Sequence, residues 1–348
     1  MNQFDNSSIY DYEPLSTDIS ESISSHKWLA FEMSPIYKGF QVTILTIAVL
    51  ISITGNSLSI VVIHKANHIK TTTKIPMFSL AICYILINMV FGIPLIGATA
   101  VSTWPYGQTM CFVLAFGMNW FYACSACILF TLNLDRYIAV TRPLHYHTLI
   151  SNWKISMLVL TAWLFSFSVT CFNAFLPYQR AFFKHDYHFC FFDPYTDEIV
   201  DIIGMINLLL LIVFPITATI VIYCKIYNIS KFHAQQIALL EQSMQRNAEK
   251  QRTLDTKAAK AFLLVTAGFV LAWLPFLIAI GYEYAFNKEP PILPWWCAFC
   301  GTVSTSINVV IYYWRNEAFR RPARKMMMRW RRVAPDETSM RVSSIILE

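Results

Sequence analysis

Three consecutive polar residues, Asp135, Arg136 and Tyr137, are the side chains whose types and position most clearly suggest chemistry. They end an apolar run, FYACSACILFTLNL over 121–134, that is typical of a membrane helix. An ionised group placed in hydrocarbon costs roughly 2.5–3.5 kcal/mol on insertion scales. A charged pair at this place must therefore serve to anchor a helix or to switch it, and its chemistry is the making and breaking of an ion pair.

Nine cysteines are the second reactive set, and their odd number excludes a complete disulfide framework. Cys124-x-x-Cys127 and Cys297-x-x-Cys300 have the spacing of zinc ligands. Both pairs lie in apolar stretches, where small polarizable residues at helix interfaces are the better explanation. We therefore expect no metal and no cofactor. We also expect no enzyme, because the chain has no HExxH motif, no GxSxG motif and no paired acids inside an apolar stretch.

The elements that position these residues are apolar helices. Hydrophobic residues make up 56% of the 348 and charged residues only 14%, whereas about a quarter of a soluble domain is charged. Seven stretches of roughly 20 or more mostly apolar residues are each long enough to cross about 30 Å of hydrocarbon. The prediction is an all-α membrane protein, a seven-transmembrane helix bundle, with spans near 38–64, 76–101, 109–137, 153–177, 200–225, 258–284 and 291–314.

The distribution of Lys and Arg predicts how the bundle is oriented, because short basic loops are poorly translocated. Of 27 basic residues, 22 lie in the connections after the first, third and fifth spans or in the carboxyl-terminal tail. The amino terminus is therefore expected outside the cell and the carboxyl terminus in the cytosol. A basic inner face suits anionic membrane lipid, so the net charge of +6 does not require a nucleic-acid partner.

The predicted bundle, 38–314, lies between two polar tails. The amino-terminal tail, 1–37, has no apolar signal segment, and it contains an acceptor sequon for glycosylation at Asn6. The carboxyl-terminal segment, 315–348, begins with apolar residues at helical spacing among seven basic ones over 320–332. That pattern predicts a short amphipathic cytoplasmic helix on the inner leaflet, which Pro322 would kink or end.

Two cysteines lie on the predicted outer side, Cys111 at the start of the third span and Cys190 in the loop 178–199. Because the outer surface is oxidising, a bond between them is the natural pairing. It would fasten that loop over the mouth of the bundle.

Several local patterns occur in a fixed order, each in its own span or beside it. They are Gly55-Asn56, Trp104-Pro105-Tyr106-Gly107, Asp135-Arg136-Tyr137 with Arg142-Pro143-Leu144, Trp163, Pro215 with Tyr223, Phe269 with Trp273-Leu274-Pro275, and Asn308-Val309-Val310-Ile311-Tyr312. In this order they resemble the rhodopsin-like family of G-protein-coupled receptors over about residues 38–330. The resemblance implies a plasma-membrane receptor whose partners are an extracellular ligand and a heterotrimeric G protein.

The resemblance also implies a switch at the cytosolic rim. Asp135 would neutralise Arg136 at rest, and Asp255 would reach it from the sixth helix as a latch that breaks when this helix moves outward. Pro143 and Leu144 would meet the G protein. The remaining switch residues are Tyr137, Tyr223, Asn308 and Tyr312.

Polar and proline residues inside the spans have physical readings of their own. Asn56 and Asn308 lie in apolar helices and must find partners across the bundle. Pro215 and Pro275 interrupt helical hydrogen bonding and provide points at which a helix can bend.

Two features depart from the family. Tyr84 occupies the second-span position where the family usually has Asp, and no carboxylate lies in the core of any span. Because sodium needs oxygen ligands and a compensating negative charge, we expect no sodium-stabilised resting state. The last motif also lacks the family's proline.

A ligand pocket is expected in the outer half of the bundle, lined by Met118, Asn119, Tyr122, Asn207, Leu211, Trp273, Phe276, Leu277, Ile280, Trp295, Ala298 and Thr302. Met118 stands where the monoamine receptors have an Asp, which makes a simple amine an unfavourable ligand. Thr302 stands where opsins have the retinal-linking Lys, and the seventh span has no Lys.

A peptide is the favoured ligand, because the tail Tyr10-Asp11-Tyr12-Glu13 and acids in the outer loops would attract a basic peptide. A lipid or another apolar small molecule is the alternative, because the expected cavity is largely apolar and aromatic. A membrane transporter, the rival from another class, would need inverted repeats or a polar path at the midplane. Neither is visible in the sequence.

Overall fold

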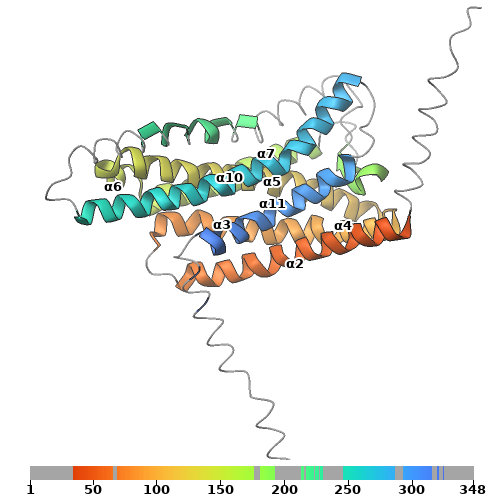
Figure 1. Cartoon of the computed structure of the whole chain (residues 1–348). Helices are drawn as coiled ribbons and strands as arrows, with labels where there is room; N and C mark the ends of the chain where they lie inside the picture. Colours follow the sequence, from red (N-terminus) through yellow and green to blue (C-terminus); the bar gives the residue numbers. More distant parts are fainter. Residues whose placement is uncertain are drawn as a thin grey trace, which may run out of the picture.

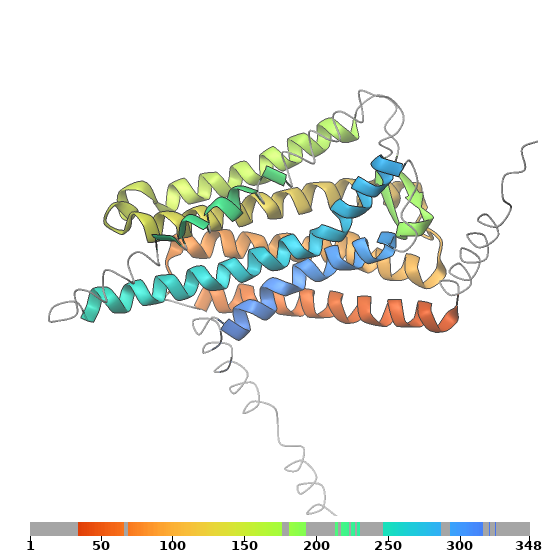
Figure 2. The same ribbon diagram turned by 45° about the horizontal axis from the view of Figure 1, so that its top comes forward.

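The computed structural model is a bundle of long helices that run side by side (Figures 1 and 2). It describes residues 34–65, 69–175, 181–192, 246–286 and 293–315, together with parts of 213–229 and positions 320 and 324. The long helices are α2 (Pro35–Lys65), α3 (Thr71–Ile87), α5 (Gly107–Thr141), α7 (Asn152–Ala174), α10 (Arg246–Phe286) and α11 (Leu293–Arg315).

Five described helical stretches are long and apolar enough to cross a membrane, Pro35–Lys65, Thr71–Val101, Gly107–Thr141, Asn152–Ala174 and Leu264–Glu283. They coincide with the first, second, third, fourth and sixth predicted spans. The seventh predicted span matches α11. Most of the fifth lies outside the described residues, and so does the predicted amphipathic helix except for positions 320 and 324.

Large apolar side chains on the outside of the helices show why these segments suit a membrane. Leu50, Leu164, Phe172 and Leu271 are all exposed, Leu271 to 66%. A soluble monomer rarely exposes contiguous apolar patches of this kind. Hydrocarbon instead covers them at no cost, while each helix satisfies its own backbone polar groups.

The second span contains a local irregularity. After α3, residues Asn88–Gly92 form a π-helical turn, η1, and the helix continues as α4 (Ile93–Val101). The backbone N–H of Ile93 bonds to the carbonyl of Asn88, five residues earlier. The Asn88 side chain also donates to the carbonyl of Tyr84 at 2.8 Å. The turn therefore places one additional residue in the helix.

The loop predicted over 178–199 contains a two-stranded antiparallel hairpin, which is the one non-helical element among the described residues. Strand β1 (Ala181–Lys184) pairs with β2 (Phe189–Phe192) through the short helix η3 (His185–Tyr187), and Phe183 lies opposite Cys190. Figure 2 shows the hairpin beside the carboxyl end of α10 and the start of α11. We call this the hairpin end of the bundle.

The opposite end of the bundle, which we call the Arg136 end, contains the carboxyl-terminal end of α5. A 3-10 turn, η2 (Pro143–His145), and a short helix, α6 (Tyr146–Leu149), lead from α5 to α7. Ser151 caps α7 by accepting a hydrogen bond from the backbone N–H of Lys154 at 3.3 Å. This connection is compact enough to fold Tyr146 back against α5.

Candidate functional site

Arg136 is turned into the bundle at the end of α5 and is only 7% exposed. Its Nε donates to Asp135 Oδ2 at 3.0 Å, and one terminal nitrogen donates to the same oxygen at 2.5 Å. The same nitrogen also donates to Thr73 Oγ1 on α3. The guanidinium is thus held by a neighbour in sequence and by a second helix.

Asp135 is fully buried and receives donors from three directions. Besides Arg136, Tyr146 Oη donates to its Oδ1 at 2.6 Å, and Thr73 Oγ1 lies 3.2 Å from its Oδ2. Thr72 Oγ1 lies 2.9 Å from Tyr146 Oη. Burial, then the charge of Asp135, raises the pKa of Tyr146 to about 12, so this phenol stays a donor.

This cluster of Arg136, Asp135, Tyr146, Thr72 and Thr73 can act as a releasable ion pair. Removing one partner of a buried pair typically costs 3–5 kcal/mol, because the other charge is left uncompensated. A replacement partner for Arg136 would therefore be needed whenever the pair opens. Leu144, close by in η2, is 91% exposed and available to a protein surface.

A second polar cluster joins α2, the π-helical turn η1 and α11 in the middle of the bundle. Asn56 Nδ2 donates to the carbonyls of Ser52 and Thr305 at 2.8 and 3.2 Å. Asn88 Nδ2 lies 2.8 Å from Ser52 Oγ and 3.0 Å from Thr305 Oγ1, and those two hydroxyls are 2.8 Å apart. These amides and hydroxyls fix the relative positions of three helices without any charge.

Tyr84 on α3 and Asn308 on α11 form a separate contact beside this cluster. Asn308 Nδ2 donates to Tyr84 Oη at 2.6 Å, and both side chains are buried. The amide oxygens of Asn308 and Asn88 are buried and have no hydrogen-bond partner among the described residues. The tyrosine therefore fills the place of the missing carboxylate and satisfies one half of the Asn308 amide.

Aromatic rings connect the hairpin to the centre of the bundle. Phe189 on β2 contacts Phe91 edge-on at 5.1 Å, Phe91 contacts Tyr122 at 6.0 Å, and Tyr122 contacts Trp273 at 4.9 Å. Trp273 in turn contacts Phe276 at 5.6 Å, within one turn of Pro275. Edge-to-face pairs of this kind are worth about 0.5–1.5 kcal/mol each beyond their burial. We call these five residues the aromatic column.

Two polar atoms in the aromatic column are unsatisfied. Tyr122 Oη and Trp273 Nε1 are buried and have no hydrogen-bond partner among the described residues. A buried donor without a partner costs about 1–3 kcal/mol. The middle of the bundle can therefore accept a group that supplies a hydrogen-bond acceptor.

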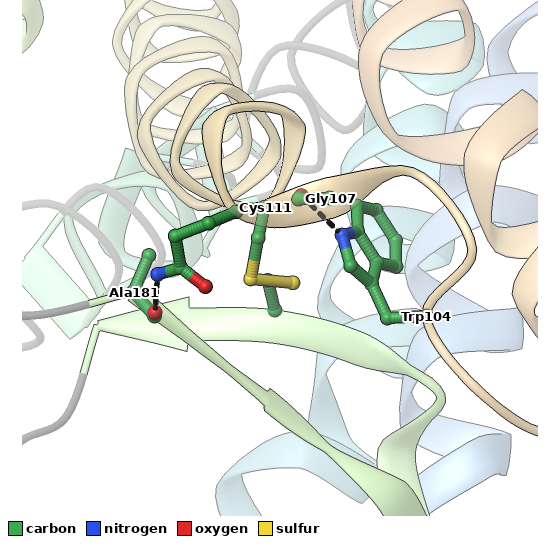
Figure 3. Close-up of a disulfide and its surroundings, with 6 residues drawn as sticks. Trp104, Gly107, Cys111 and Ala181 are labelled. Atoms are coloured by element: carbon green, nitrogen blue, oxygen red, sulfur yellow. Dashed lines mark hydrogen bonds between the residues drawn. A yellow bond between two sulfur atoms is a disulfide. The ribbon is translucent and has the colours of Figure 1, made fainter.

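The hairpin is attached to the bundle at three places. Cys111 on α5 forms a disulfide with Cys190, and Gln108 Nε2 donates to the carbonyl of Ala181 at 2.6 Å (Figure 3). Lys184 Nζ lies 3.0 Å from Glu283 Oε1 on α10, with both side chains largely buried. The hairpin is thus tied both to α5 and to α10.

The described part of the predicted pocket divides into three groups. Tyr122, Trp273, Trp295, Ala298 and Thr302 are buried, and Trp295 Nε1 donates to Thr99 Oγ1 at 3.1 Å. The Thr302 hydroxyl donates a hydrogen bond to the carbonyl of Ala298, one turn earlier in the helix. Met118, Phe276, Leu277 and Ile280 are half-buried, whereas Asn119 is exposed and donates to the carbonyl of Ala115 on its own helix.

Several predicted site residues cannot be placed. Asn6, Asn207, Leu211 and Tyr223 lie outside the described residues, and the side chains of Pro143, Asp255 and Tyr312 are likewise outside the description. The expected reach of Asp255 toward Arg136 therefore stays a prediction.

Reasoning from the sequence missed six polar contributors. Thr72, Thr73 and Tyr146 complete the environment of Asp135. Ser52, Asn88 and Thr305 complete the central cluster. The available signal was spacing, because Ser52 with Asn56 and Tyr84 with Asn88 are each four residues apart and so share a helix face.

A third contact between helices was missed in the same way. Asn133 Nδ2 lies 3.1 Å from Thr219 Oγ1 and 3.3 Å from Thr266 Oγ1. This amide joins α5 to α10 and to the partly described helix over 217–226, one turn before Arg136 on α5.

The arrangement can be compared with known proteins. The model of the family "7 transmembrane receptor (rhodopsin family)" matches residues 55–312, most of the chain. The chain belongs to the rhodopsin family of seven-transmembrane receptors. This confirms the predicted seven-helix class, and it makes the protein a multi-pass membrane receptor that signals through G proteins and is not an enzyme.

Curated relatives of this receptor differ in the ligands that their names state. It is 27% identical to trace amine-associated receptor 13c of Danio rerio over 276 residues, covering 77% of this chain and 80% of that protein. It is also 27% identical to neuropeptide receptor 22 of Caenorhabditis elegans over 314 residues, covering 83% of this chain and 70% of that protein.

Among solved structures, squid rhodopsin aligns with this receptor at a TM-score of 0.75 and 19% identity, covering 86% of this chain and 87% of that one. At this identity the likeness concerns the fold alone.

Proposed function

We propose that this receptor binds an extracellular peptide at its hairpin end and transmits that event to a heterotrimeric G protein at its Arg136 end. The observation that carries the proposal is the burial of Arg136 against Asp135, Thr73 and the Tyr146 phenol. A buried guanidinium with a dedicated counter-ion is unfavourable in a purely structural role. It is well suited to an element with two states.

The proposed orientation, with the amino terminus outside, places the hairpin end in the extracellular space. The bias of basic residues toward the other side supports it. The Cys111–Cys190 disulfide at the hairpin end also supports it, since such bonds persist in an oxidising compartment.

In the proposed mechanism the aromatic column carries the signal inward. A ligand beneath the hairpin would displace or reorient Trp273, which is two residues before Pro275 in α10. Because proline cannot complete the helical hydrogen bonds, α10 can bend at this point. Movement of its other end would then expose Arg136 to a G-protein helix.

The ligand is proposed to supply a hydrogen-bond acceptor to Tyr122 and Trp273. Peptide carbonyl groups are acceptors of this kind, and they would satisfy two donors that have no partner in the described receptor. A simple amine offers no such acceptor. The only carboxylate in α5 is Asp135, at the wrong end of the helix to pair with an ammonium group beneath the hairpin.

An apolar small molecule with a carbonyl or ether oxygen is the second candidate ligand. The aromatic column favours it, because three of its five residues are phenylalanines, and the only polar groups in it are the Trp273 indole N–H and the Tyr122 phenol. Such a ligand would bind through apolar contacts and need only one acceptor.

The experiment is guanine-nucleotide exchange by purified heterotrimers with the receptor in nanodiscs, screened against peptide, lipid and amine libraries. We expect a peptide to accelerate exchange, and Arg136→Gln to abolish the response while ligand binding persists. A binding peptide that accelerates no heterotrimer would overturn the coupling proposal. A response confined to lipids or amines would overturn the peptide proposal only.

The proposed latch between Arg136 and Asp255 has its own test. Asp255→Ala should raise ligand-independent exchange, because it removes the negative charge that this proposal places near Arg136 in the resting state. Glu249→Ala, an acid on the same helix α10, is the matched control. Equal basal exchange in both variants would remove the latch.

A further inference from the structure

A neutral polar contact joins three helices one turn before Arg136. The Nδ2 atom of Asn133 on α5 lies 3.1 Å from Thr219 Oγ1 and 3.3 Å from Thr266 Oγ1. The Thr266 hydroxyl also lies 3.5 Å from Asn133 Oδ1. All three side chains are at most 5% exposed. We call these three residues the Asn133 triad, and none of them belongs to the motifs that carry the family resemblance.

The surroundings of the Asn133 triad are apolar. Leu132 beside Asn133, and Val265 and Phe269 near Thr266, are all buried. An amide placed among such side chains costs free energy unless hydrogen bonds compensate for the lost water. A leucine of similar size would fill this place without that requirement. The amide is therefore explained by what it holds, which is α10 on one side and the helix over 217–226 on the other.

Helix α10 is also held from its opposite side at this level. Gly268, two residues after Thr266, lies directly against α11, because a Cβ atom added to it would be 2.5 Å from Ile307 Cγ2. Residues two apart in a helix point in nearly opposite directions. This part of α10 is therefore clamped between Ile307 and the Asn133 amide. It can move away from α5 only by losing its contact with Asn133.

The position of Thr266 along α10 makes this contact sensitive to movement. Thr266 is nine residues before Pro275 and Asp255 is twenty, which is about 14 Å and about 30 Å along the helix axis. If α10 turns about Pro275 as a rigid rod, Thr266 moves about half as far as Asp255. A displacement of about 2 Å at Asp255 then takes the contact beyond hydrogen-bonding distance. Even a small opening of α10 breaks it.

Release of Thr266 is inexpensive and reversible. A threonine in a helix can turn its hydroxyl to a carbonyl one turn earlier, as Thr131 does with the Cys127 carbonyl at 3.0 Å. Asn133 keeps Thr219 as a partner. Side-chain hydrogen bonds between membrane helices are individually weak. The Asn133 triad can thus bias the receptor toward its resting state without locking it there.

We propose that Asn133 is a positioning residue for G-protein coupling. Its amide holds α10 against α5 in the resting receptor through Thr266, and this bond is lost as soon as the inner end of α10 moves outward. The inference rests on the movement of α10 in the proposed function. It adds a restraint without charge to the ion pair of Arg136 and Asp135, on a different helix from the partners of that pair.

The experiment measures ligand-independent nucleotide exchange by the full receptor in nanodiscs with purified heterotrimers. Thr266→Val and Asn133→Leu should each raise basal exchange about three- to fifteenfold, the effect of losing one weak interhelical bond. Thr131→Val is the matched control, because this buried threonine bonds only within its own helix in the described structure. Thr266→Ser keeps the hydroxyl and should restore the resting rate.

Combined variants test whether the two residues act as one contact. The double variant of Asn133→Leu with Thr266→Val should be no more active than the more active single variant, because both remove the same bond. Thr266→Val combined with Asp135→Asn should instead multiply the two increases, because the restraints are separate. Fully multiplied increases for Asn133→Leu with Thr266→Val would overturn the assigned contact.

A second readout does not need the heterotrimer. Fluorine NMR of receptor with trifluoromethylphenylalanine in place of Lys250, near the start of α10, reports the populations of its positions. Thr266→Val should shift these populations, and Thr131→Val should not. Thermal unfolding midpoints check that the variants fold.

The outcomes separate this proposal from the proposed function. A lower unfolding midpoint for Thr266→Val, with the basal exchange and fluorine spectrum of Thr131→Val, would overturn it and leave the triad a purely structural contact. A fluorine shift without faster exchange would support the restraint on α10, and it would overturn the coupling of that movement to the heterotrimer.

Discussion

Asn308 on α11 donates a hydrogen bond of 2.6 Å to the hydroxyl of Tyr84 on α3. The two residues are 224 positions apart in the chain and both are buried. Because the other half of the Asn308 amide has no partner among the described residues, this bond alone satisfies the side chain. It links the second and seventh spans through neutral groups.

Tyr84→Phe should therefore destabilise the receptor. The ring is retained but Asn308 is left with both amide groups unpaired, at a cost of about 0.5–2 kcal/mol. The measurement is the thermal unfolding midpoint in detergent micelles. Tyr106→Phe is the control, since that phenol is exposed near the hairpin end. Equal midpoints for the two variants would contradict the assigned role of the bond.

Sodium should not change agonist affinity relative to a matched potassium control. Hard cations bind where oxygen ligands and negative charge converge, and the buried residues around Tyr84 supply only amides and hydroxyls. Competition binding at equal ionic strength measures this. Tyr84→Asp should introduce sodium sensitivity, and a sodium effect in the unaltered receptor would refute the expectation.

Asp135→Asn should raise ligand-independent nucleotide exchange. The amide keeps the shape and can still accept from Tyr146, but the charge that holds Arg136 is lost. The assay is basal nucleotide exchange by reconstituted receptor, with equal amounts of each receptor variant. Glu283→Gln, which opens the ion pair at the hairpin end instead, serves as control. Basal exchange no higher than that of the control would argue against the ion pair as a restraint.

The stability of the receptor should depend on pH through His188 in the hairpin. Burial, and then the charges of Lys38 and His185, lower the pKa of His188 to about 4. Because this pKa lies below the ordinary 6.5, the unfolded chain binds the proton first. The contribution of neutral His188 to the stability of the folded receptor is therefore fully present above pH 6.5, and it is lost as the pH falls toward 4.

The matched variant for this test is His188→Asn. Asparagine tolerates the positive φ of 57° at this position. Thermal midpoints from about pH 7 to about pH 4.5 should fall more steeply in the unaltered receptor than in the variant, by on the order of 2–3 kcal/mol in stability at the acid end. Parallel slopes would show that another group titrates.

Particular residues show how far the sequence could predict this structure. Apolar length located the helices, so that the predicted 109–137 and 291–314 fall within or beside Gly107–Thr141 and Leu293–Arg315. The expectation that Asn56 and Asn308 find partners across the bundle agrees with their bonds to Thr305 and Tyr84.

The partners themselves could not be derived, because they depend on how the helices are rotated and spaced. Tyr146 lies eleven residues after Asp135 in what reads as an ordinary loop, and only the fold of η2 and α6 returns it to the carboxylate. The hairpin strands were missed for a similar reason. Four-residue strands rich in Phe give too short a pattern to separate from a loop.

The π-helical turn at Asn88–Gly92 sets the angular phase of everything that follows it in the second span. One surplus residue advances later side chains by about 100° around the axis. Leu95 and Ala98, both without any exposed surface, face inward as a result. Deleting a single residue from this turn would rotate a different face of α4 toward the ligand. The ligand selectivity of the receptor would then change although no residue that contacts the ligand had been substituted.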